Sequence, residues 1–283
     1  MARKKIKIPK KQLYYLYYKK KMSLKAIGNL VGCCRETVAS RIRECGLQLR
    51  KLGIWQTKYK KQDFSGDEVE KSYLLGFRVG DVSVRRPYKN SKIIIVGCHT
   101  TRHEQIQLME EIFQKYGQIV ISRSQSMEGK QSFFINCNLN KSFSFLLFSK
   151  PYHMENWTTK KFTNSVAFMA GYTDAEGNFI LNQNKARFKI DSYDFPILDW
   201  MHKWLSEYGI NSKLRLLAKK GSRGYNKDNK IFKNDLWRFN INNAYSLLRF
   251  CAFIIPFTKH KKRIGDMLKC MFNIIQRKQD ETI

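Results

Sequence analysis

The sequence predicts an α+β fold in which two similar halves follow a small all-α domain. Each half has the predicted order helix, two strands, helix, two strands, helix. Three observations lead to this prediction. A short motif occurs twice, and the segments after each copy follow the same order. The N-terminal residues have apolar positions at helical spacing. The charge is strongly basic, with 53 Lys and Arg against 23 Asp and Glu, which gives a net charge of +30.

This composition favours nucleic acid as the partner. A folded chain with a net charge of +30 repels itself unless it binds a polyanion, and DNA or RNA is the usual one. The apolar stretch 247–257 is too short to cross a membrane and contains Arg249. With neither a basic amphipathic helix nor a lipidation signal, we expect no membrane partner. Seven cysteines without a CxxC pair predict neither a disulfide framework nor a zinc ribbon.

The first domain is expected to span residues 1–62, with a basic linker at its end. Three helices are predicted: one after Pro9, one capped by Ser23, and one that follows a turn at Gly32 and ends at Gly46. Apolar positions with helical spacing are assigned to their inner faces: Leu13, Leu16, Tyr17, Leu24, Ile27, Leu30, Val31, Val38 and Ile42.

The third predicted helix has an outer face of short polar and basic side chains, which suit a DNA major groove: Arg35, Thr37, Ser40, Arg41 and Arg43. The stretch SLKAIGNLVGCCRETVASRIRECGL resembles the helix-turn-helix of resolvase-like and transposase-like DNA-binding modules. A plain three-helix bundle with a solvated basic face is the alternative. The excess of eighteen Lys and Arg over two acids in residues 1–61 favours the DNA-binding interpretation.

The remainder of the chain repeats itself, and we expect a first half at residues 63–157 and a second at 158–283. YLLGFRVGD, starting at Tyr73, matches FMAGYTDAEG, starting at Phe168. Alternating segments follow at 91–98 and 178–190, amphipathic helices at 104–117 and 195–209, strand-like segments at 133–139 and 236–242, and then a last apolar helix in each half. The glycines and asparagines of a basic loop at 218–235 predict the tip of a long hairpin.

Small residues recur four apart in both motif helices: Gly76 and Gly80 in the first, and Gly171 and Ala175 in the second. A glycine inside a helix costs about 1 kcal/mol relative to alanine. A glycine at matched places therefore indicates that two helix backbones approach closely, although ordinary core helices with incidental glycines remain the alternative.

Two acids, Asp81 and Glu176, follow these small residues at matched offsets. A carboxylate at the C-terminal end of a helix is disfavoured by the helix dipole, and two that face each other repel further. A divalent cation would relieve both effects, because hard cations bind carboxylate together with phosphate oxygens. The alternative is a structural hydrogen bond in the following turn.

At these residues the chain resembles the LAGLIDADG homing endonucleases, with LLGFRVGDV and MAGYTDAEG as two motif copies over roughly residues 72–255. The resemblance implies two αββαββα halves around a central helix pair, forming a β-saddle on double-stranded DNA. It implies Asp81 and Glu176 as catalytic, metal-binding acids with magnesium or manganese (Mg2+ or Mn2+). Val79 and Val82 depart from the motif. The basic residue that commonly assists has only loose candidates in Lys185, Lys189 and Arg238.

Polar and basic residues of the strands and loops are the candidate DNA contacts, since they alternate with apolar ones as in a sheet with one face on DNA. In the first half they are Arg85, Arg86, Lys89 and Lys92. In the second half they are Asn182, Asn184, Lys185, Arg187, Lys189, Arg223, Lys227, Lys230 and Arg238. Each could equally be a solvated surface side chain.

The sequence thus predicts a monomeric, metal-dependent, site-specific endonuclease that hydrolyses phosphodiester bonds in both strands of DNA. The alternative is a non-cleaving nucleic-acid binder of the same fold, either an intron RNA maturase or a transcriptional regulator. A recombinase is a weaker option, because no nucleophile context supports it. The recognition sequence and the host compartment, microbial or organellar, stay open.

Overall fold

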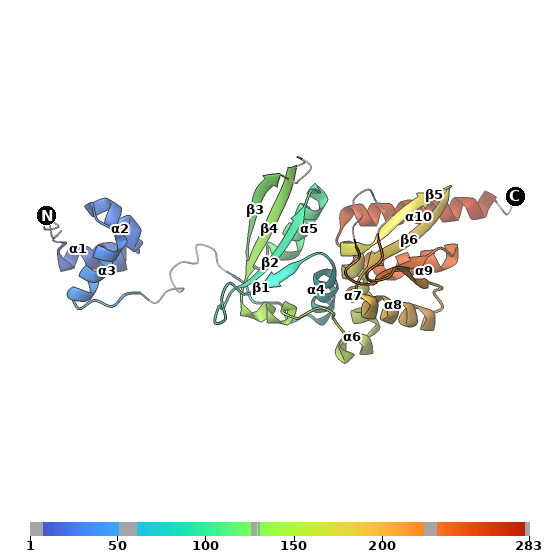
Figure 1. The fold of residues 1–283 in the computed structure, drawn as a ribbon, viewed down its shortest axis with the longest axis horizontal. Helices are drawn as coiled ribbons and strands as arrows, with labels where there is room; N and C mark the ends of the chain where they lie inside the picture. The colour runs from blue at the N-terminus through green and yellow to red at the C-terminus, as the bar shows by residue number, and fades with distance from the viewer. Residues whose placement is uncertain (1–7, 51–60, 126–128, 130, 224–230, 281–283) are drawn as a thin grey trace. The chain divides into compact units, whose positions relative to one another are not determined.

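The computed structural model describes residues 8–50, 61–125, 129, 131–223 and 231–280. The chain divides into two compact units, one up to Lys60 and one from Lys61. The second unit has two four-stranded antiparallel sheets with helices, and the first has helices in its described part. The predicted α+β class is therefore confirmed (Figure 1).

The first unit contains α1 (Lys10–Tyr14), the π-helix η1 (Tyr15–Lys19), α2 (Leu24–Val31) and α3 (Arg35–Glu44). The Ser23 hydroxyl accepts a hydrogen bond from the Ala26 amide at 3.1 Å and so caps α2, as predicted. Gly32 ends α2 with a φ of +73°, a backbone angle that favours glycine. Residues from all these helices, together with Ile8 before α1, form a core of their own: Ile8, Leu13, Leu16, Tyr17, Ile27, Val38 and Ile42.

Leu30 is the exception to the predicted inner faces, because its side chain is 62% exposed. The buried face of α2 is centred on Ile27 and Gly28 instead. A Cβ on Gly28 would lie 2.4 Å from the carbonyl oxygen of Cys33, so the turn into α3 packs directly on this face. Leu30 is about 200° around the helix from Gly28 and faces away. The position of the third helix, rather than hydrophobicity, decides which side of α2 is buried.

The second unit is built from two successive halves. The first comprises α4 (Glu68–Gly80), β1 (Ser83–Arg85), β2 (Ile94–Thr100), α5 (His103–Phe113), β3 (Gln118–Gln125), β4 (Gln131–Leu139) and the 3-10 helix η2 (Lys141–Leu146). After α6 (Asn156–Lys160), the second comprises α7 (Phe162–Glu176), β5 (Asn178–Asn182), β6 (Lys185–Ser192), α8 (Phe195–Glu207), β7 (Lys213–Ala218), β8 (Leu236–Ile241) and α9 (Ala244–Ile254). The short 3-10 helix η3 (Ile255–Phe257) and α10 (Lys261–Asp280) follow.

The two sheets have the same topology. Their strand orders are β1-β2-β4-β3 and β5-β6-β8-β7, and all neighbours are antiparallel. One face of each sheet is apolar and covered: Val96 pairs with Cys137, which pairs with Ile119, in the first sheet, and Phe188 pairs with Ile241 in the second. The opposite face carries the polar members of each strand, so each sheet has one core face and one outer face.

The β5–β6 hairpin has a two-residue turn at Gln183 and Asn184, both with positive φ, near +50°. Two left-handed residues in a row match the twist of a tight hairpin. The predicted strand segment 178–190 is therefore two strands. The loop at 218–235 does connect the antiparallel strands β7 and β8, as predicted, and its described part contains the bridge between Arg223 and Ile231.

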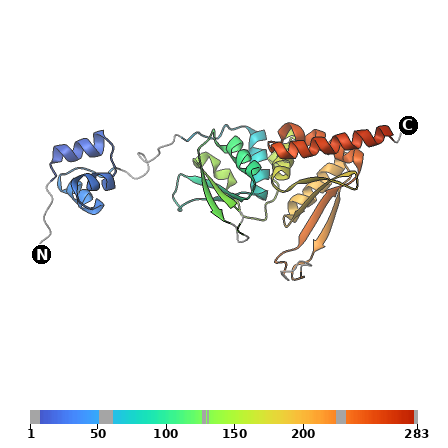
Figure 2. The same ribbon diagram turned by 90° about the horizontal axis from the view of Figure 1, so that it is seen from above.

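Two elements differ from the sequence-based prediction. The last helix of the first half is only the six-residue 3-10 helix η2, and Pro151, which cannot continue a helix, follows shortly after it. The second half gains α10, a 20-residue helix that the repeat did not predict (Figure 2). Met267, Cys270 and Ile274 of α10 are buried in the core that both halves share.

All seven cysteines are free. Within the described ranges, no helix combines the length and apolarity that a membrane crossing requires.

Candidate active site and nucleic-acid interface

The two motif helices α4 and α7 pack backbone to backbone. A Cβ on Gly76 would lie 2.0 Å from the carbonyl oxygen of Phe168, and one on Gly171 would lie 2.1 Å from that of Tyr73. The two glycines thus make the same contact in opposite directions, as a pseudo-two-fold axis between the halves requires. No side chain fits at either place, which explains why each helix accepts the cost of a glycine.

The second pair of small residues continues this seam toward the C-terminal ends of the helices. A Cβ on Gly80 would lie 2.3 Å from the Cβ of Ala175. Asp81 follows Gly80 as the C-cap of α4, and Glu176 follows Ala175 as the last residue of α7. The close contact at Gly80 therefore brings the two acids to the same end of the helix pair.

The two carboxyl groups interact electrostatically. Burial, followed by the charges of Asp81 and Asp194, raises the pKa of Glu176 to about 7. Loss of hydration among the surrounding protein groups raises the pKa of Asp81 to about 6. Glu176 is half-buried and Asp81 is exposed on one side, so neither acid is sealed from solvent.

Two cations, Lys150 and Arg263, face both acids, since the charge of each lowers the pKa of Asp81 and of Glu176. Lys150 also lies 3.7 Å from the carboxylate of Asp194. Arg263 is largely enclosed, and its Nε atom is buried without a hydrogen-bond partner. In addition, the side-chain amide of Gln105 donates to Oδ2 of Asp81 at 3.0 Å.

Sequence reasoning missed both cations. The candidates it named, Lys185, Lys189 and Arg238, lie on strands of the second sheet, and Arg238 forms two 2.6 Å hydrogen bonds with Asp191. Lys150 lies in the connection after η2, and Arg263 lies in the first turn of α10, where the repeat offers no counterpart to align. Their positive charge is their signal in the sequence, and it does not distinguish them because the chain has 53 Lys and Arg residues.

Asp174, two residues before Glu176, fixes the start of α10. Its Oδ2 atom accepts hydrogen bonds from the Tyr73 hydroxyl at 2.6 Å and from the backbone amides of Lys259 at 2.9 Å and His260 at 3.2 Å. The side chain thus holds the chain just before the turn that carries Arg263. In the first half the equivalent position is Val79, which is buried in the core.

The donor set suits a hard cation that is shared with a substrate. Asp81 and Glu176 offer carboxylate oxygens. Burial is the main cause of their raised pKa values, and the charge of Asp81 adds to it for Glu176, so a divalent cation would stabilise the ionised pair. Among the described residues, no group of three His, Cys, Asp or Glu is arranged to hold a metal. The pair therefore fits a metal whose remaining ligands come from phosphate and water, rather than an all-protein site.

The outer face of the second sheet gathers most of the predicted strand contacts. Lys189 pairs with Asn240, which pairs with Lys213, and Arg187 pairs with Ile180 in the next row. Asn182 pairs with Lys185 at the hairpin end. Asn184 lies in the hairpin turn, and its side-chain oxygen accepts a hydrogen bond from Asn273 of α10 at 2.7 Å.

The first-half candidates lie elsewhere. Arg85 is on the outer face of β1, opposite Ile95, whereas Arg86, Lys89 and Lys92 are exposed in the connection from β1 to β2. In the long loop Arg223 is exposed, and Lys227 and Lys230 lie outside the described residues.

In the first unit the predicted groove-facing residues are exposed, except for Arg41. Arg35, Thr37, Ser40 and Arg43 lie on the open side of α3. The guanidinium of Arg41 instead makes a 2.9 Å ion pair with Glu44 and donates to the Ile8 carbonyl at 3.4 Å. It is half-buried because it ties α3 to the chain before α1.

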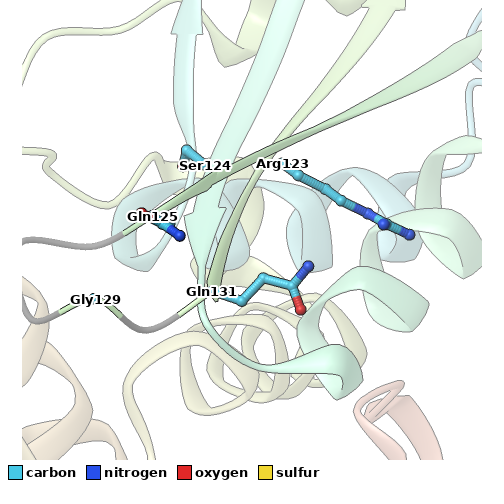
Figure 3. A pocket seen from close by; sticks show the side chains of 5 residues that line it. All are labelled: Arg123, Ser124, Gln125, Gly129 and Gln131. Atoms are coloured by element: carbon cyan, nitrogen blue, oxygen red, sulfur yellow. The ribbon is translucent and has the colours of Figure 1, made fainter.

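A shallow polar hollow lies at the end of the β3–β4 hairpin (Figure 3). It is lined by Arg123, Ser124, Gln125, Gly129 and Gln131. Neither Asp81 nor Glu176 contributes to its lining, so it is separate from the carboxylate pair. Its polar and cationic lining suits a sugar–phosphate backbone better than an apolar ligand.

Comparison with solved structures finds proteins of similar architecture. The homing endonuclease I-WcaI bound to its DNA recognition sequence is 16% identical, with a TM-score of 0.49, covering 75% of this chain and 92% of that one. A variant of I-DmoI in complex with its target DNA, with manganese, is 16% identical, with a TM-score of 0.44, covering 67% and 96%. The N-terminal LAGLIDADG domain of DUF199/WhiA is 17% identical, with a TM-score of 0.43, covering 71% and 88%.

Comparison with curated protein sequences gives no match. The family model of the LAGLIDADG-like domain, however, matches residues 163–254, which run from α7 to the end of α9. This is the stretch that holds the second motif copy, the second sheet and Glu176. The chain is therefore a protein with a LAGLIDADG-like domain at residues 163–254, and its first half repeats the same sheet topology on the other side of the helix pair.

Proposed function

We propose that this protein is a site-specific endonuclease that cuts both strands of double-stranded DNA by metal-dependent hydrolysis. The observation that carries the proposal is the pairing of Asp81 with Glu176 at one end of the glycine seam. Each acid comes from one half, and Asp81 is exposed while Glu176 is half-buried. Two equivalent acids near a pseudo-two-fold axis match two scissile phosphates on opposite strands.

Asp81 and Glu176 would hold Mg2+ or Mn2+ together with phosphate oxygens. When bound, such an ion activates water for attack on phosphorus and stabilises the departing 3′ oxygen. The raised pKa of Glu176, about 7, means that the metal-free pair readily keeps a proton, which cation binding displaces. Activity should therefore rise with pH through the range in which both acids ionise.

The neighbouring cations would act on the substrate rather than on the ion. Lys150 and Arg263 face both acids, and a guanidinium or ammonium group there can bind a non-bridging phosphate oxygen. Gln105 would hold the Asp81 carboxylate in place through its 3.0 Å hydrogen bond. The two cations would offset the repulsion between the two carboxylates and the anionic DNA backbone, which would otherwise weaken DNA binding.

DNA binding itself would rest on the outer faces of the two sheets and on the first unit. The second sheet presents Arg187 and Lys189 beside Lys213 on its outer face. The exposed residues of α3 would add contacts in a further groove, as a helix-turn-helix does. Because phosphate neutralisation releases counterions, affinity should fall steeply as salt is added.

The test is incubation of the purified full chain with a DNA duplex that spans the insertion site of its own gene, with magnesium and then with EDTA. Double-strand cuts that require magnesium support the proposal. Asp81→Asn and Glu176→Gln should each abolish cutting and leave duplex binding within about threefold, because they remove charge but little volume. Lys203→Gln, which breaks an exposed ion pair on α8 with Asp199, is the matched control and should cut normally.

Tight, specific duplex binding without cuts under any metal would reject the nuclease proposal and leave a DNA-binding regulator of the same fold. Preferential binding of the intron transcript over the duplex would instead identify an RNA-binding maturase. Loss of duplex binding in both acid variants would make Asp81 and Glu176 structural residues.

A further inference from the structure

The two outer sheet faces differ strongly in charge. On the second sheet, six strand residues of the outer face are cationic and one, Asp191, is acidic: Lys185, Arg187, Lys189, Lys213, Arg215 and Arg238. On the first sheet, the corresponding strand positions hold a single cation, Arg85, and no acid. The outer-face strand residues therefore carry a net charge of +5 on the second sheet and +1 on the first, although the two sheets have the same topology.

The first sheet fills its outer face with neutral side chains arranged in cross-strand rows. One row is His99, Phe134 and Ser122, and the next is Gly97, Asn136 and Val120. The rings of His99 and Phe134 lie 4.3 Å apart at an interplanar angle of 31°. Phe134 is 48% exposed and Val120 is 40% exposed, so an apolar patch stands among amide and hydroxyl groups.

The strand residues of this face provide little neutralisation of a DNA backbone, because they include a single cation. Its groups do suit the floor of a major groove. Asn and Gln side chains hydrogen-bond to adenine, and phenylalanine makes apolar contact with the methyl group of thymine. On the same face, Asn136 lies in the row next to the aromatic pair, and Asn138 and Gln118 lie in the row after that.

We propose that the first sheet reads its DNA half-site through base edges, with Phe134 and His99 set against thymine methyl groups, while the second sheet supplies most of the phosphate contacts. This inference rests on the proposed function, since it assumes that both outer faces lie on one duplex. The occupant is double-stranded DNA because the outer face of the second sheet carries six cations, which suit a polyanionic backbone. His99 also already covers one face of the Phe134 ring, which disfavours base stacking.

The test begins with selection of bound duplexes from a random-sequence duplex library by the full chain, in EDTA so that no strand is cut. Thymines of the selected site are then replaced by deoxyuridine, one half-site at a time, which removes only the methyl groups. We expect the replacement in one half-site to lower wild-type affinity about fourfold for each contacted methyl. Phe134→Ala should abolish this discrimination, and Phe134→Leu should retain part of it.

The salt dependence separates the two sheets. Phe134→Ala should leave the slope of log affinity against log salt unchanged, whereas Arg187→Ala and Lys189→Ala should each reduce it by about one. Phe272→Ala, which removes an exposed phenylalanine from α10, is the matched control and should alter neither quantity.

Three results would overturn the inference. Full discrimination between thymine and deoxyuridine by Phe134→Ala would remove Phe134 from the interface. A change of salt slope in that variant would mean that the first sheet acts on phosphate. Selection of single-stranded RNA over duplex, lost in Phe134→Ala, would make the aromatic pair a base-stacking site. Failure to select any duplex with wild-type protein would instead reject the proposed function as well.

Discussion

The hydroxyl of Tyr73 donates a 2.6 Å hydrogen bond to the carboxylate of Asp174, and this bond joins the two motif helices across their seam. The same carboxylate oxygen accepts the amides of Lys259 and His260 before α10. Burial is the main cause that raises the pKa of Asp174 to about 6, and the three hydrogen bonds oppose it. One side chain thus connects α4, α7 and the C-terminal helix.

Asp174→Ala should therefore destabilise the second unit by about 2–3 kcal/mol, because it leaves three buried donors without an acceptor. Asp174→Asn keeps one oxygen acceptor and should cost less. Tyr73→Phe removes a single hydrogen bond and should cost about 1 kcal/mol. Urea unfolding followed by tryptophan fluorescence measures these differences. Equal stability of wild type and Asp174→Ala would mean that the network contributes nothing.

The glycine seam predicts a large effect from a single methyl group. Gly171→Ala places a Cβ about 2.1 Å from the carbonyl oxygen of Tyr73 and should destabilise the unit by about 3 kcal/mol or more, since two helices must separate. Gly265→Ala on α10 is the matched control. Its Cβ meets nothing within 4 Å, so helix propensity should make it neutral or stabilising by up to about 1 kcal/mol.

Thermal unfolding of the two alanine variants checks this difference. A Tm for Gly171→Ala within about two degrees of the wild-type Tm corresponds to a destabilisation of only about 0.5 kcal/mol. Such a small change would contradict the close contact between the two helix backbones.

The carboxylate pair predicts a stability that falls with rising pH. The folded protein raises the pKa of Glu176 to about 7, above its ordinary value, so it binds a proton more tightly than the unfolded chain does. The stabilisation that this proton provides is fully present at pH values below the pKa of Glu176 in the unfolded chain. It is lost as the pH rises through about 7, the pKa of Glu176 in the folded protein. At pH 8 without metal, Glu176→Gln should then be more stable than wild type by about 1–2 kcal/mol.

The advantage of Glu176→Gln should disappear near pH 4, where both forms are neutral. Added magnesium should raise the Tm of wild type at pH 8 but not that of the variant, because only the wild type binds the ion. A variant that gains as much from magnesium as the wild type would exclude Glu176 as a metal ligand.

Arg263 predicts a shift of the pH profile of cleavage. Its charge lowers the pKa of both acids, so Arg263→Gln should raise both values and move the half-maximal rate to higher pH. Arg263→Lys keeps the charge and should restore most of the original profile. A lower rate with an unchanged profile would place Arg263 on the substrate alone.

The repeat, and much of what it implies, could be predicted from the amino-acid sequence alone. The matched glycines, the matched acids and the alternation of apolar residues are local patterns. They fixed the paired helices, the sheets of the two halves and the positions of Asp81 and Glu176 at the helix ends. The two-fold relation follows because a residue repeated at the same offset occupies the same place in both halves.

The residues that surround the helix pair and the two acids could not be predicted in this way. Lys150, Arg263 and the cap that Asp174 makes on α10 come from segments far apart in the chain and outside the repeat, so no spacing rule relates them to the acids. The exposure of Leu30 and the unequal charge of the two outer faces likewise depend on which face another element covers. Periodicity specifies which residues share a face of one element, whereas contacts between distant segments specify what that face meets.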